Sequence, residues 1–329
     1  MRFLVVSIIS VMLLMTAACG KGKTGTDKAV KKIGIVLSIG GLGDKSFNDS
    51  AFRGLENAKK DLGIEFSYVE PQSPSEDEQY LRKYAEGKYD LVIAVGFLMK
   101  DACEKVAKEF PDTKFAIIDS VIELPNVASI VFKEEEGSFL VGALAAMMSK
   151  TGTIGFVGGI DVPLIRKFLV GYEQGALYVN KNIKVKSLFV GGQNPFSDPV
   201  KGKESAVSLI KQKADVVYHA AGGTGLGVIE GAKEQKVFAI GVDSDQDYIA
   251  EGTVLTSMMK YVDNAVYATV KDIINGTFTG GVHSLGLKED GVGTTAFTYT
   301  KTAIGETNIQ KLEQIKKDII DGKIVVKDK

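Results

Sequence analysis

The sequence predicts an α/β protein made of two similar lobes, each with a parallel sheet sandwiched by helices. Short apolar runs alternate with longer amphipathic segments along most of the 329 residues, which is the pattern that strand–helix–strand units produce. The apolar runs are continuous, as expected for strands that helices cover on both faces. The alternation falls into two sets, each about the size of one domain, and two sets indicate two lobes.

The first set begins with the apolar run KIGIVLS at 32–38, which predicts a strand. A helix is expected from about residue 49, with apolar side chains on one stripe and Gly63 as its left-handed C-cap. The segment 75–87 starts with acidic residues and ends in glycine, which favours a second helix. Further strands are expected at 64–70, 89–96, 114–119 and 127–132, and a third helix at 99–109.

The second set starts with a helix at 134–150, whose glycine and alanine residues suit close packing of helices. Apolar runs then predict strands at 152–159, 183–190, 214–220, 236–243 and 253–259. Helices are expected between them at 164–180, 200–213 and 225–234.

The composition argues against nucleic-acid binding and against a structural zinc site. Lysine plus arginine (40) nearly balances aspartate plus glutamate (41), whereas nucleic-acid-binding proteins normally carry a basic excess. The two cysteines, at 19 and 103, and the two histidines, at 219 and 283, are scattered and form no zinc motif. We therefore expect no metal and no cofactor, and we expect Cys103 to be a buried, unpaired helix residue.

The first 18 residues are predicted to be a signal peptide. Arg2 precedes the apolar run FLVVSIISVMLLM, which is too short for a confident membrane span. The run ends in TAACG, which is similar to a bacterial lipobox although Thr16 stands where leucine is usual. We expect Cys19 to be lipidated and residues 19–31 to form a flexible polar tether. An ordinary secretory signal with a chance cysteine is the alternative.

The loop SIGGLGDKSFND at 38–49 resembles a phosphate-binding loop but carries the wrong charge for one. A Walker A loop places its lysine directly after the last glycine, whereas here Asp44 separates Gly43 from Lys45. A carboxylate at this place would repel bound phosphates. The loop also offers the aromatic Phe47 and the amide of Asn48, which suit a neutral, flat, hydrogen-bonding ligand.

Ligands of open parallel sheets bind outside the carboxyl ends of the strands. Acidic, aromatic and glycine residues follow the predicted strands of both lobes at these ends. Two lobes that face each other across such edges would form a closing cleft. The candidate ligand-binding residues are Asp44, Phe47, Asn48, Asp119, Phe196, Gly222, Gly223, Asp243 and Lys260.

Most of these candidates have a structural alternative. Asp119 and Asp243 could cap the turns after their strands, and Lys260 could form a structural ion pair. Phe47 and Phe196 could be core residues, although both lie in polar loops, which favours ligand contact. The segment GGTGLG near residue 223 lacks the spacing of a dinucleotide fingerprint.

Catalytic motifs are absent from the sequence. Neither histidine stands near a serine or cysteine nucleophile signature, and neither G-x-S-x-G nor H-E-x-x-H occurs. A glycosidase-like pair of Asp119 and Asp243 from different lobes is the enzymatic arrangement that stays open. We do not expect an enzyme.

Six stretches together are similar to the Bmp/PnrA/TmpC family of basic-membrane-protein-type lipoproteins, the nucleoside-binding components of ABC importers. They are GDKSFND, IID at 117–119, NPFSDP, HAAGGTG, GVDSD and the C-terminal IIDGKIVV. The resemblance covers nearly all of the chain after residue 31. It implies the type I periplasmic-binding-protein fold with three crossings between the lobes, near 132, 260 and 282.

The domain boundaries follow from these crossings. The N-terminal lobe is expected at 32–131 plus 261–281, and the C-terminal lobe at 132–260 plus 282–329. The resemblance also implies a monomer that is anchored to the bacterial cell membrane by lipid, faces the periplasm or exterior, and works with ABC permease and ATPase subunits.

The resemblance further implies a purine nucleoside of the inosine, guanosine or adenosine class as ligand. The base would lie between Phe47 and Phe196. Asn48 and Asp119 would hydrogen-bond the base. Asp243, Lys260 and the backbone at 222–223 would hold the ribose hydroxyls, with Asp44 nearby.

Three other functions stay open at this point. The cleft could take a sugar or an autoinducer, since pyranose sites also use acids and aromatics. A nucleoside-cleaving enzyme would need a general acid or a metal. A surface adhesin or antigen is the third, and it is compatible with transport.

Overall fold

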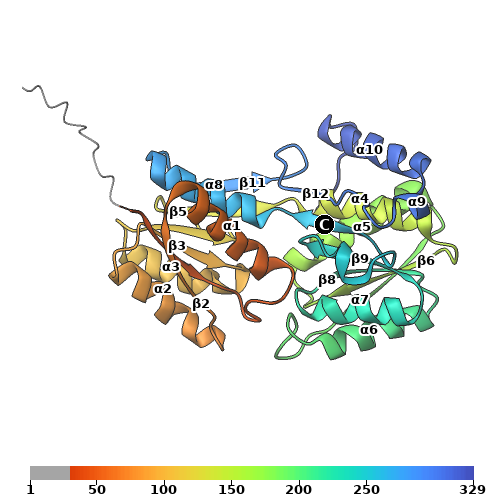
Figure 1. Cartoon of the computed structure of the whole chain (residues 1–329), viewed down its shortest axis with the longest axis horizontal. Coiled ribbons are helices and arrows are strands. Elements are labelled where there is room, and N and C mark those ends of the chain that lie inside the picture. The colour runs from red at the N-terminus through yellow and green to blue at the C-terminus, as the bar shows by residue number, and fades with distance from the viewer. Residues whose placement is uncertain (1–29) are drawn as a thin grey trace, which may run out of the picture.

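The computed structural model describes residues 30–329 and shows two lobes side by side, joined along one side (Figure 1). The expected signal peptide, Cys19 and most of the tether fall in residues 1–29 and so lie outside the described residues. Among the described residues, no helix has the length and apolar character needed to span a membrane.

The first lobe contains a six-stranded sheet in which all strands run parallel. Helices α1 and α8 cover one face of this sheet, and α2 and α3 cover the other. In spatial order the strands are β11 (Gly281–Leu285), β5 (Val127–Phe132), β4 (Lys114–Ile118), β3 (Leu91–Val95), β1 (Lys32–Val36) and β2 (Glu65–Val69). The helices are α1 (Phe47–Leu62), α2 (Asp77–Glu86), α3 (Lys100–Glu109) and α8 (Val262–Asn275), with 3-10 turns η1 (Pro74–Glu76) and η2 (Phe97–Met99).

The second lobe repeats this plan with one difference. Its six-stranded sheet is parallel except for the edge strand β12, which pairs antiparallel with β10. In spatial order the strands are β12 (Val292–Thr294), β10 (Val254–Lys260), β9 (Phe238–Asp243), β8 (Val216–Ala220), β6 (Thr153–Gly158) and β7 (Lys184–Phe189). The helices are α4 (Glu134–Met148), α5 (Pro163–Val179), α6 (Pro199–Lys211) and α7 (Thr224–Glu234), with the 3-10 turn η3 (Asp247–Ala250).

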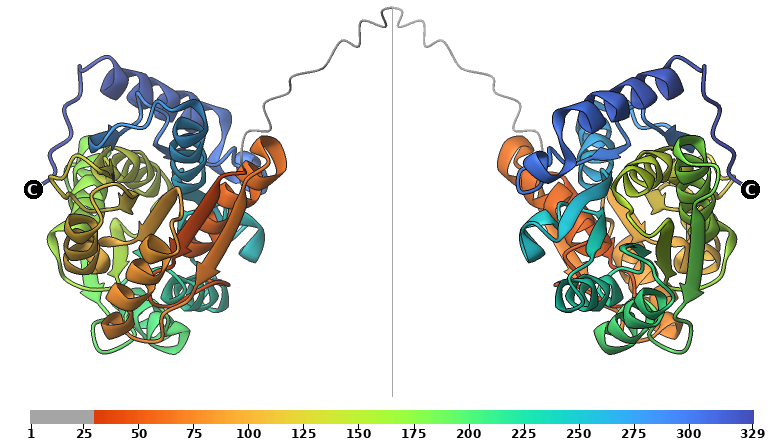
Figure 2. Two further views of the ribbon diagram at one scale, coloured as in Figure 1. Left: turned by 90° about the vertical axis from the view of Figure 1, so that its left-hand side faces the viewer. Right: turned by 90° about the vertical axis from the view of Figure 1, so that its right-hand side faces the viewer.

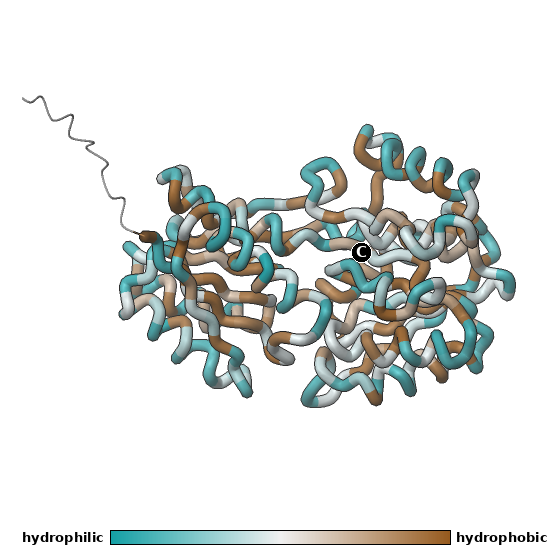
Figure 3. The backbone as a smooth tube through the Cα atoms, viewed as in Figure 1, coloured by the Kyte–Doolittle hydropathy of each residue, from teal (hydrophilic) through white to brown (hydrophobic). Residues whose placement is uncertain are grey.

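The C-terminal segment forms α9 (Lys301–Ile304) and α10 (Glu306–Ile320). Helix α10 packs on α4 of the second lobe, outside the helices that cover the sheet (Figure 2). The hydropathy of the chain follows the layers: apolar residues are concentrated in the strands inside each lobe, and polar residues on the outer helices (Figure 3).

The strands predicted from apolar runs are confirmed, because β1 through β10 all lie within or at the expected ranges. Cys103 is fully buried in α3 and is a free cysteine, as predicted. Burial raises the pKa of its thiol to about 12, so it is not a reactive thiolate at neutral pH.

The chain crosses between the lobes three times, and the crossings lie together on one side of the molecule (Figure 1). They run from β5 to α4, from β10 to α8 and from β11 to β12. The third crossing comes after Leu285 and not near residue 282, because β11 pairs with β5 of the first sheet along its whole length. Residues 282–285 therefore belong to the first lobe.

Helices α4 and α5 pack unusually close to each other through glycine. A methyl group on Gly142 would overlap the backbone of Tyr172, and one on Gly175 would overlap the backbone of Phe139. The helices thus meet backbone to backbone, as the small residues of 134–150 predicted. A methyl group on Gly171 would likewise overlap the backbone of Glu135, so the same close packing holds the start of α4.

Candidate functional site

A cavity of about 620 Å³, its opening to solvent included, lies between the two lobes. Its wall is formed at the carboxyl ends of strands from both sheets, where parallel sheets bind their ligands. Eight of the nine predicted residues line it: Asp44, Phe47, Asn48, Asp119, Phe196, Gly222, Asp243 and Lys260.

Gly223 is the predicted residue that does not line the cavity. It is buried at the start of α7, and a methyl group on it would lie 3.6 Å from the Cβ of Asp44. Gly223 therefore sits where the two lobes approach each other. The nearby Gly222, with a φ of 51°, turns the chain into the cavity wall.

Asp44 holds the start of α1 in place. Its carboxylate accepts backbone N–H bonds from Ser46 at 2.8 Å, Asn48 at 2.8 Å and Asp49 at 3.2 Å. Burial raises the pKa of Asp44, and these three backbone bonds oppose the rise. Because both of its oxygens already accept backbone hydrogen bonds, the main role of Asp44 is to fix the shape of the loop, and contact with a ligand is secondary.

Asn48 keeps one hydrogen-bonding group free for a ligand. Its side-chain Oδ1 accepts the backbone N–H of Ser38 at 2.9 Å. That bond assigns the oxygen of the amide, so the Nδ2 group is the donor that remains. Asn48 is buried and lines the cavity, where a free amide donor would meet an acceptor on the ligand.

A buried ionic cluster joins the two lobes behind the cavity. The Nζ atom of Lys260 donates to Oδ2 of Asp119 at 2.5 Å and lies 3.3 Å from Oε1 of Glu134. The side chains of Lys260, Asp119 and Glu134 are only 2%, 6% and 0% exposed. Lys260 ends β10 and Glu134 starts α4, so the cluster lies at two of the three crossings.

The neighbouring carboxylates of this cluster keep Lys260 charged. Burial alone would lower the pKa of Lys260, but the carboxylates of Asp119, Glu134 and Asp243 raise it above its ordinary value. Lys260 is therefore a permanent ammonium. Within the described residues Oδ1 of Asp119 has no hydrogen-bond partner, and Asp119 lines the cavity. A buried acceptor without a partner is energetically costly, so a ligand that donates a hydrogen bond to it is bound favourably.

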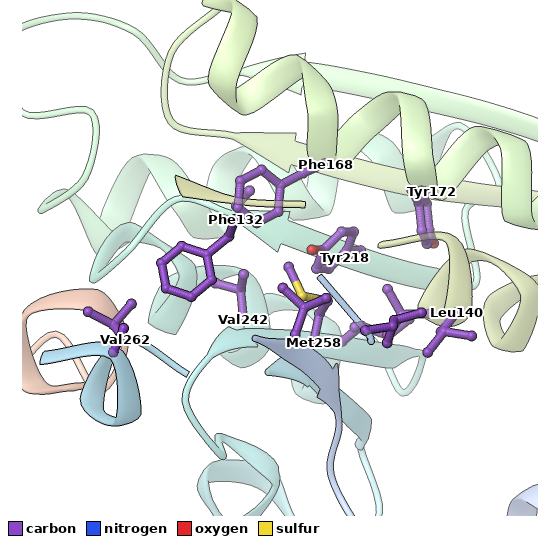
Figure 4. Packing of buried hydrophobic residues seen from close by; sticks show 14 of the residues in the cluster. Phe132, Leu140, Phe168, Tyr172, Tyr218, Val242, Met258 and Val262 are labelled. Atoms are coloured by element: carbon purple, nitrogen blue, oxygen red, sulfur yellow. The ribbon is translucent and has the colours of Figure 1, made fainter. Parts of the chain in front are cut away.

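Three phenylalanine rings surround the Lys260 ammonium. Its Nζ lies 5.0 Å from the ring centre of Phe47, 5.1 Å from that of Phe132 and 5.6 Å from that of Phe168. Phe132 and Phe168 belong to one buried apolar cluster, which contains residues of both lobes (Figure 4). Cation–π contacts at such distances stabilise a desolvated ammonium. Phe47 thus packs against Lys260 and also lines the cavity.

Asp119 and Asp243 share a feature that the sequence pattern did not reveal. Asp119 directly follows β4 and Asp243 is the last residue of β9, and both have a left-handed backbone, at φ values of 66° and 64°. Aspartate adopts this conformation at single positions more readily than most residues do. Each lobe therefore uses a left-handed aspartate to carry a carboxylate from the end of a strand into the cavity wall.

Asp243 accepts a hydrogen bond from the first lobe. The hydroxyl of Ser46 donates to its Oδ2 at 2.5 Å. Burial raises the pKa of Asp243 to about 6, although Lys260 and the Ser46 hydroxyl lower it. Among the described residues the Ser46 hydroxyl is the one donor to this carboxylate, so a ligand hydroxyl could add a second hydrogen bond.

The most important residue that the sequence reasoning missed is Glu134. It is the first of three consecutive glutamates at the start of α4, where acidic residues are common because of the helix dipole. Phe168 was missed because it occupies an apolar stripe of α5 that is typical of core residues. The remaining wall is mostly apolar: Ile39, Phe97, Leu98, Leu164, Ile165 and Ala220.

Glu134→Gln should flatten the pH dependence of stability. Burial raises the pKa of Glu134 to about 7, opposed by Lys260 and Lys167 and assisted by Asp119. The folded state therefore holds a proton more tightly than the unfolded chain, and the free energy of unfolding falls as pH rises from about 4.5 to about 7. The slope removed is at most ~1.4 kcal/mol per pH unit. Thermal unfolding between pH 4 and 8 measures it; unchanged slopes in the variant would refute this role.

Among residues 30–329, no group of three or more His, Cys, Asp or Glu side chains could hold a metal ion. His219 is fully buried, and its Nε2 lies 3.0 Å from Oε1 of Gln246. Burial lowers its pKa to about 4, so it stays neutral. Its side chain serves the core of the second lobe.

Comparison with known proteins gives concordant matches. Residues 31–329 match the Bmp family, described as "ABC transporter substrate-binding protein PnrA-like". The chain is 39% identical to a lipoprotein of Pyrococcus abyssi, over 88% of this chain and 76% of that protein. It is 34% identical to basic membrane protein A of Borreliella burgdorferi, over 99% of this chain and 96% of that protein.

A solved structure agrees with the fold. An ABC transporter solute-binding protein from Aeropyrum pernix K1 superposes with a TM-score of 0.84 at 32% identity, covering 90% of this chain and 94% of that one. The matches confirm the resemblance inferred from the six sequence stretches and the predicted type I periplasmic-binding-protein fold.

Proposed function

Because the chain belongs to the Bmp family of PnrA-like substrate-binding proteins of ABC transporters, we propose that it binds purine nucleosides between its lobes and delivers them to a permease. The observation that carries the proposal is the pairing of a free acceptor with a free donor at the cavity. Oδ1 of Asp119 lacks a partner among the described residues, and Oδ1 of Asn48 is already bonded, which leaves its Nδ2 as a donor.

A purine base offers the matching groups. Guanine and hypoxanthine carry an N1–H donor beside acceptors at O6 and N7. One base can therefore donate a hydrogen bond to Asp119 and accept one from Asn48. Phe47 and Phe196 are both half-buried in the cavity wall. A planar base between two such rings gains about 1–3 kcal/mol per stack.

The charge of the wall favours a nucleoside over a nucleotide. The wall contains three carboxylates, on Asp44, Asp119 and Asp243, and one ammonium, on Lys260. A phosphate group would face this acidic excess. A ribose is neutral, and its hydroxyls can donate to Asp243, whose side chain accepts only the Ser46 hydroxyl among the described residues. Lys260 is bonded to Asp119 and close to Glu134, so it supports the base-binding carboxylate and leaves the ribose mainly to Asp243 and the backbone at Gly222.

Two measurements test the proposed function. Mass spectrometry of protein purified without added nucleoside should detect a purine nucleoside released on denaturation. Calorimetric titration should give tight binding of guanosine, inosine or adenosine and no heat with glucose or galactose. Incubation with inosine should leave it intact; release of free hypoxanthine would identify an enzyme. Binding of a sugar in place of all three nucleosides would overturn the proposal.

Phe196→Ala should weaken nucleoside binding by about one to two powers of ten, because one stacking surface is lost. Folding should be nearly unaffected, since Phe196 is half-buried in a loop at the cavity. Phe66→Ala removes a ring that packs with Phe52 and does not line the cavity, so it serves as the control in the same titrations. A large fall in melting temperature with unchanged affinity would show that Phe196 is a core residue.

The anchor and the partners are also part of the proposal. Relatives of the chain are named lipoproteins and membrane proteins, which supports lipidation at Cys19. A lipidated monomer would hold the binding domain near the permease and ATPase subunits of its importer. Mass spectrometry of the N-terminal peptide from the membrane fraction would show acyl chains on Cys19; an unmodified thiol there would exclude the anchor.

A further inference from the structure

Hydrogen bonds connect the start of α1 in the first lobe to the loop after β9 in the second. The Ser46 hydroxyl donates to Asp243, as described above, and the Ser244 hydroxyl donates to the backbone oxygen of Ser46 at 3.0 Å. A third bond runs from Nε2 of Gln246 to the backbone oxygen of Lys45 at 3.1 Å. We call these five residues the interlobe clamp: Lys45, Ser46, Asp243, Ser244 and Gln246.

Both sides of the interlobe clamp are held rigidly by their own lobes. On the second lobe, Oε1 of Gln246 accepts the backbone N–H of Val242 at 2.9 Å, and the backbone N–H of Gln246 donates to Ser257 at 2.9 Å. On the first lobe, the carboxylate of Asp44 accepts the backbone N–H of Ser46. The two sides therefore meet as preformed surfaces.

Four of the five residues of the interlobe clamp are buried, and the exposed Lys45 contributes only its backbone oxygen. Ser46 and Gln246 are fully buried, and Asp243 and Ser244 are 6% and 5% exposed. Because buried polar groups need partners, these bonds stabilise the closed arrangement, and separating the lobes would return the groups to water. The clamp thus belongs to the closed state of the cleft.

Asp243 belongs both to the interlobe clamp and to the cavity wall. Its Oδ2 accepts the Ser46 hydroxyl, and its side chain lines the cavity. We propose that Ser46 is a positioning residue that ties the ligand-facing Asp243 to lobe closure, so that a ligand hydroxyl bonded to Asp243 completes the clamp. This inference rests on the proposed function only in taking that hydroxyl to come from a ribose.

The raised pKa of Asp243 agrees with this role. Burial is its main cause, so the closed cleft holds a carboxylate with too few donors when Ser46 is its only hydroxyl partner among residues 30–329. A ligand hydroxyl supplies the missing donor. Closure is then favoured most when ligand and Ser46 bind the carboxylate together.

Ser46→Ala tests the inference with guanosine as the probe. Dissociation of guanosine should become about tenfold faster, while association changes less than about twofold, because the lost bond forms on closure and a factor of ten corresponds to one hydrogen bond. Ser197→Ala is the matched control. This exposed serine lies in the loop before α6, on the cleft side of the second lobe, and Gly40 of the first lobe lies close to it. Its kinetics should equal those of the wild type.

The analogue 2′,3′-dideoxyguanosine separates positioning from a purely structural role. It lacks the ribose hydroxyls, so Ser46→Ala should accelerate its dissociation clearly less than that of guanosine. The Ser46–Asp243 bond is lost with both ligands, but only guanosine also has a hydroxyl bond to Asp243 that Ser46 positions. An equal acceleration for both ligands, or wild-type kinetics with guanosine, would overturn the inference. Calorimetric melting of each variant shows whether it is folded; if Ser46→Ala does not fold, Ser244→Ala takes its place with the same expectations at a smaller effect.

Failure of the proposed function is distinguishable from failure of this inference. If guanosine binds neither the wild type nor Ser46→Ala, the proposed function fails but the interlobe clamp is still untested by kinetics. Amide hydrogen exchange without ligand then tests the interlobe clamp. Exchange at residues 45–50 and 242–246 should be faster in Ser46→Ala than in Ser197→Ala, and equal exchange would overturn the clamp.

Discussion

Lys260→Met should lower the free energy of unfolding by about 3–5 kcal/mol at pH 7, as expected when one partner of a buried ion pair is removed. Methionine keeps much of the length of the side chain but leaves Asp119 and Glu134 without their shared ammonium. Asp243 also loses a favourable charge. Denaturant unfolding at pH 7 and pH 5 measures the effect. The loss should be smaller at pH 5, because Glu134 and Asp243, with pKa values of about 7 and about 6, are then mostly protonated.

Lys203→Met is the matched control for this experiment. Lys203 pairs with Glu230 and Glu234 on the surface of the second lobe. Exposed pairs contribute about 0–1 kcal/mol, so this variant should stay close to the wild type. A Lys260→Met variant that is no less stable than Lys203→Met would show that the buried cluster does not depend on the ammonium. Combining Lys260→Met with Glu134→Gln should recover part of the loss, since one uncompensated carboxylate is removed.

The sequence predicted the two sheets well because most of their strands are buried on both faces. β3 and β8, for example, are buried at every residue and appear as continuous apolar runs. β11 was not predicted because it lies at a sheet edge, and its residues alternate between half-buried and exposed. β12 has three residues, too few for a periodic signal. The position of the third crossing depended on β11 and was therefore misplaced.

The sequence predicted the location of those candidate residues that lie at or just after strand ends. Carboxyl ends of parallel strands converge, so eight of the nine candidates could be placed at one cavity without knowing how the lobes meet. The partners of those residues depend on the meeting of the lobes, and the sequence does not contain that geometry in any local pattern. Ser46 and Glu134 are the examples: both bond or approach residues more than 100 positions away.

Asp119→Asn should reduce the affinity for guanosine and inosine about a hundredfold. Lys260 can only donate, so the Asn oxygen must take the place of Oδ2, which receives the Lys260 bond. The Asn NH₂ group then replaces the free Oδ1 and points a donor at the N1–H donor of the base. Losing a charge-assisted bond and leaving a buried donor unpaired together cost at least ~2.7 kcal/mol.

Adenosine separates base recognition from a general effect on the cavity. It has no N1–H, so its affinity should fall less than about tenfold in Asp119→Asn, because no charge-assisted bond from N1 is lost. The matched control is Asp112→Asn, which makes the same change at an exposed position outside the cavity. Calorimetric titration of the three nucleosides against both variants measures the pattern. The free Oδ1 of Asp119 can accept a hydrogen bond from the N1–H of guanosine or inosine but not from N1 of adenosine. Equal small losses of affinity for all three nucleosides would therefore mean that Asp119 serves only to hold Lys260.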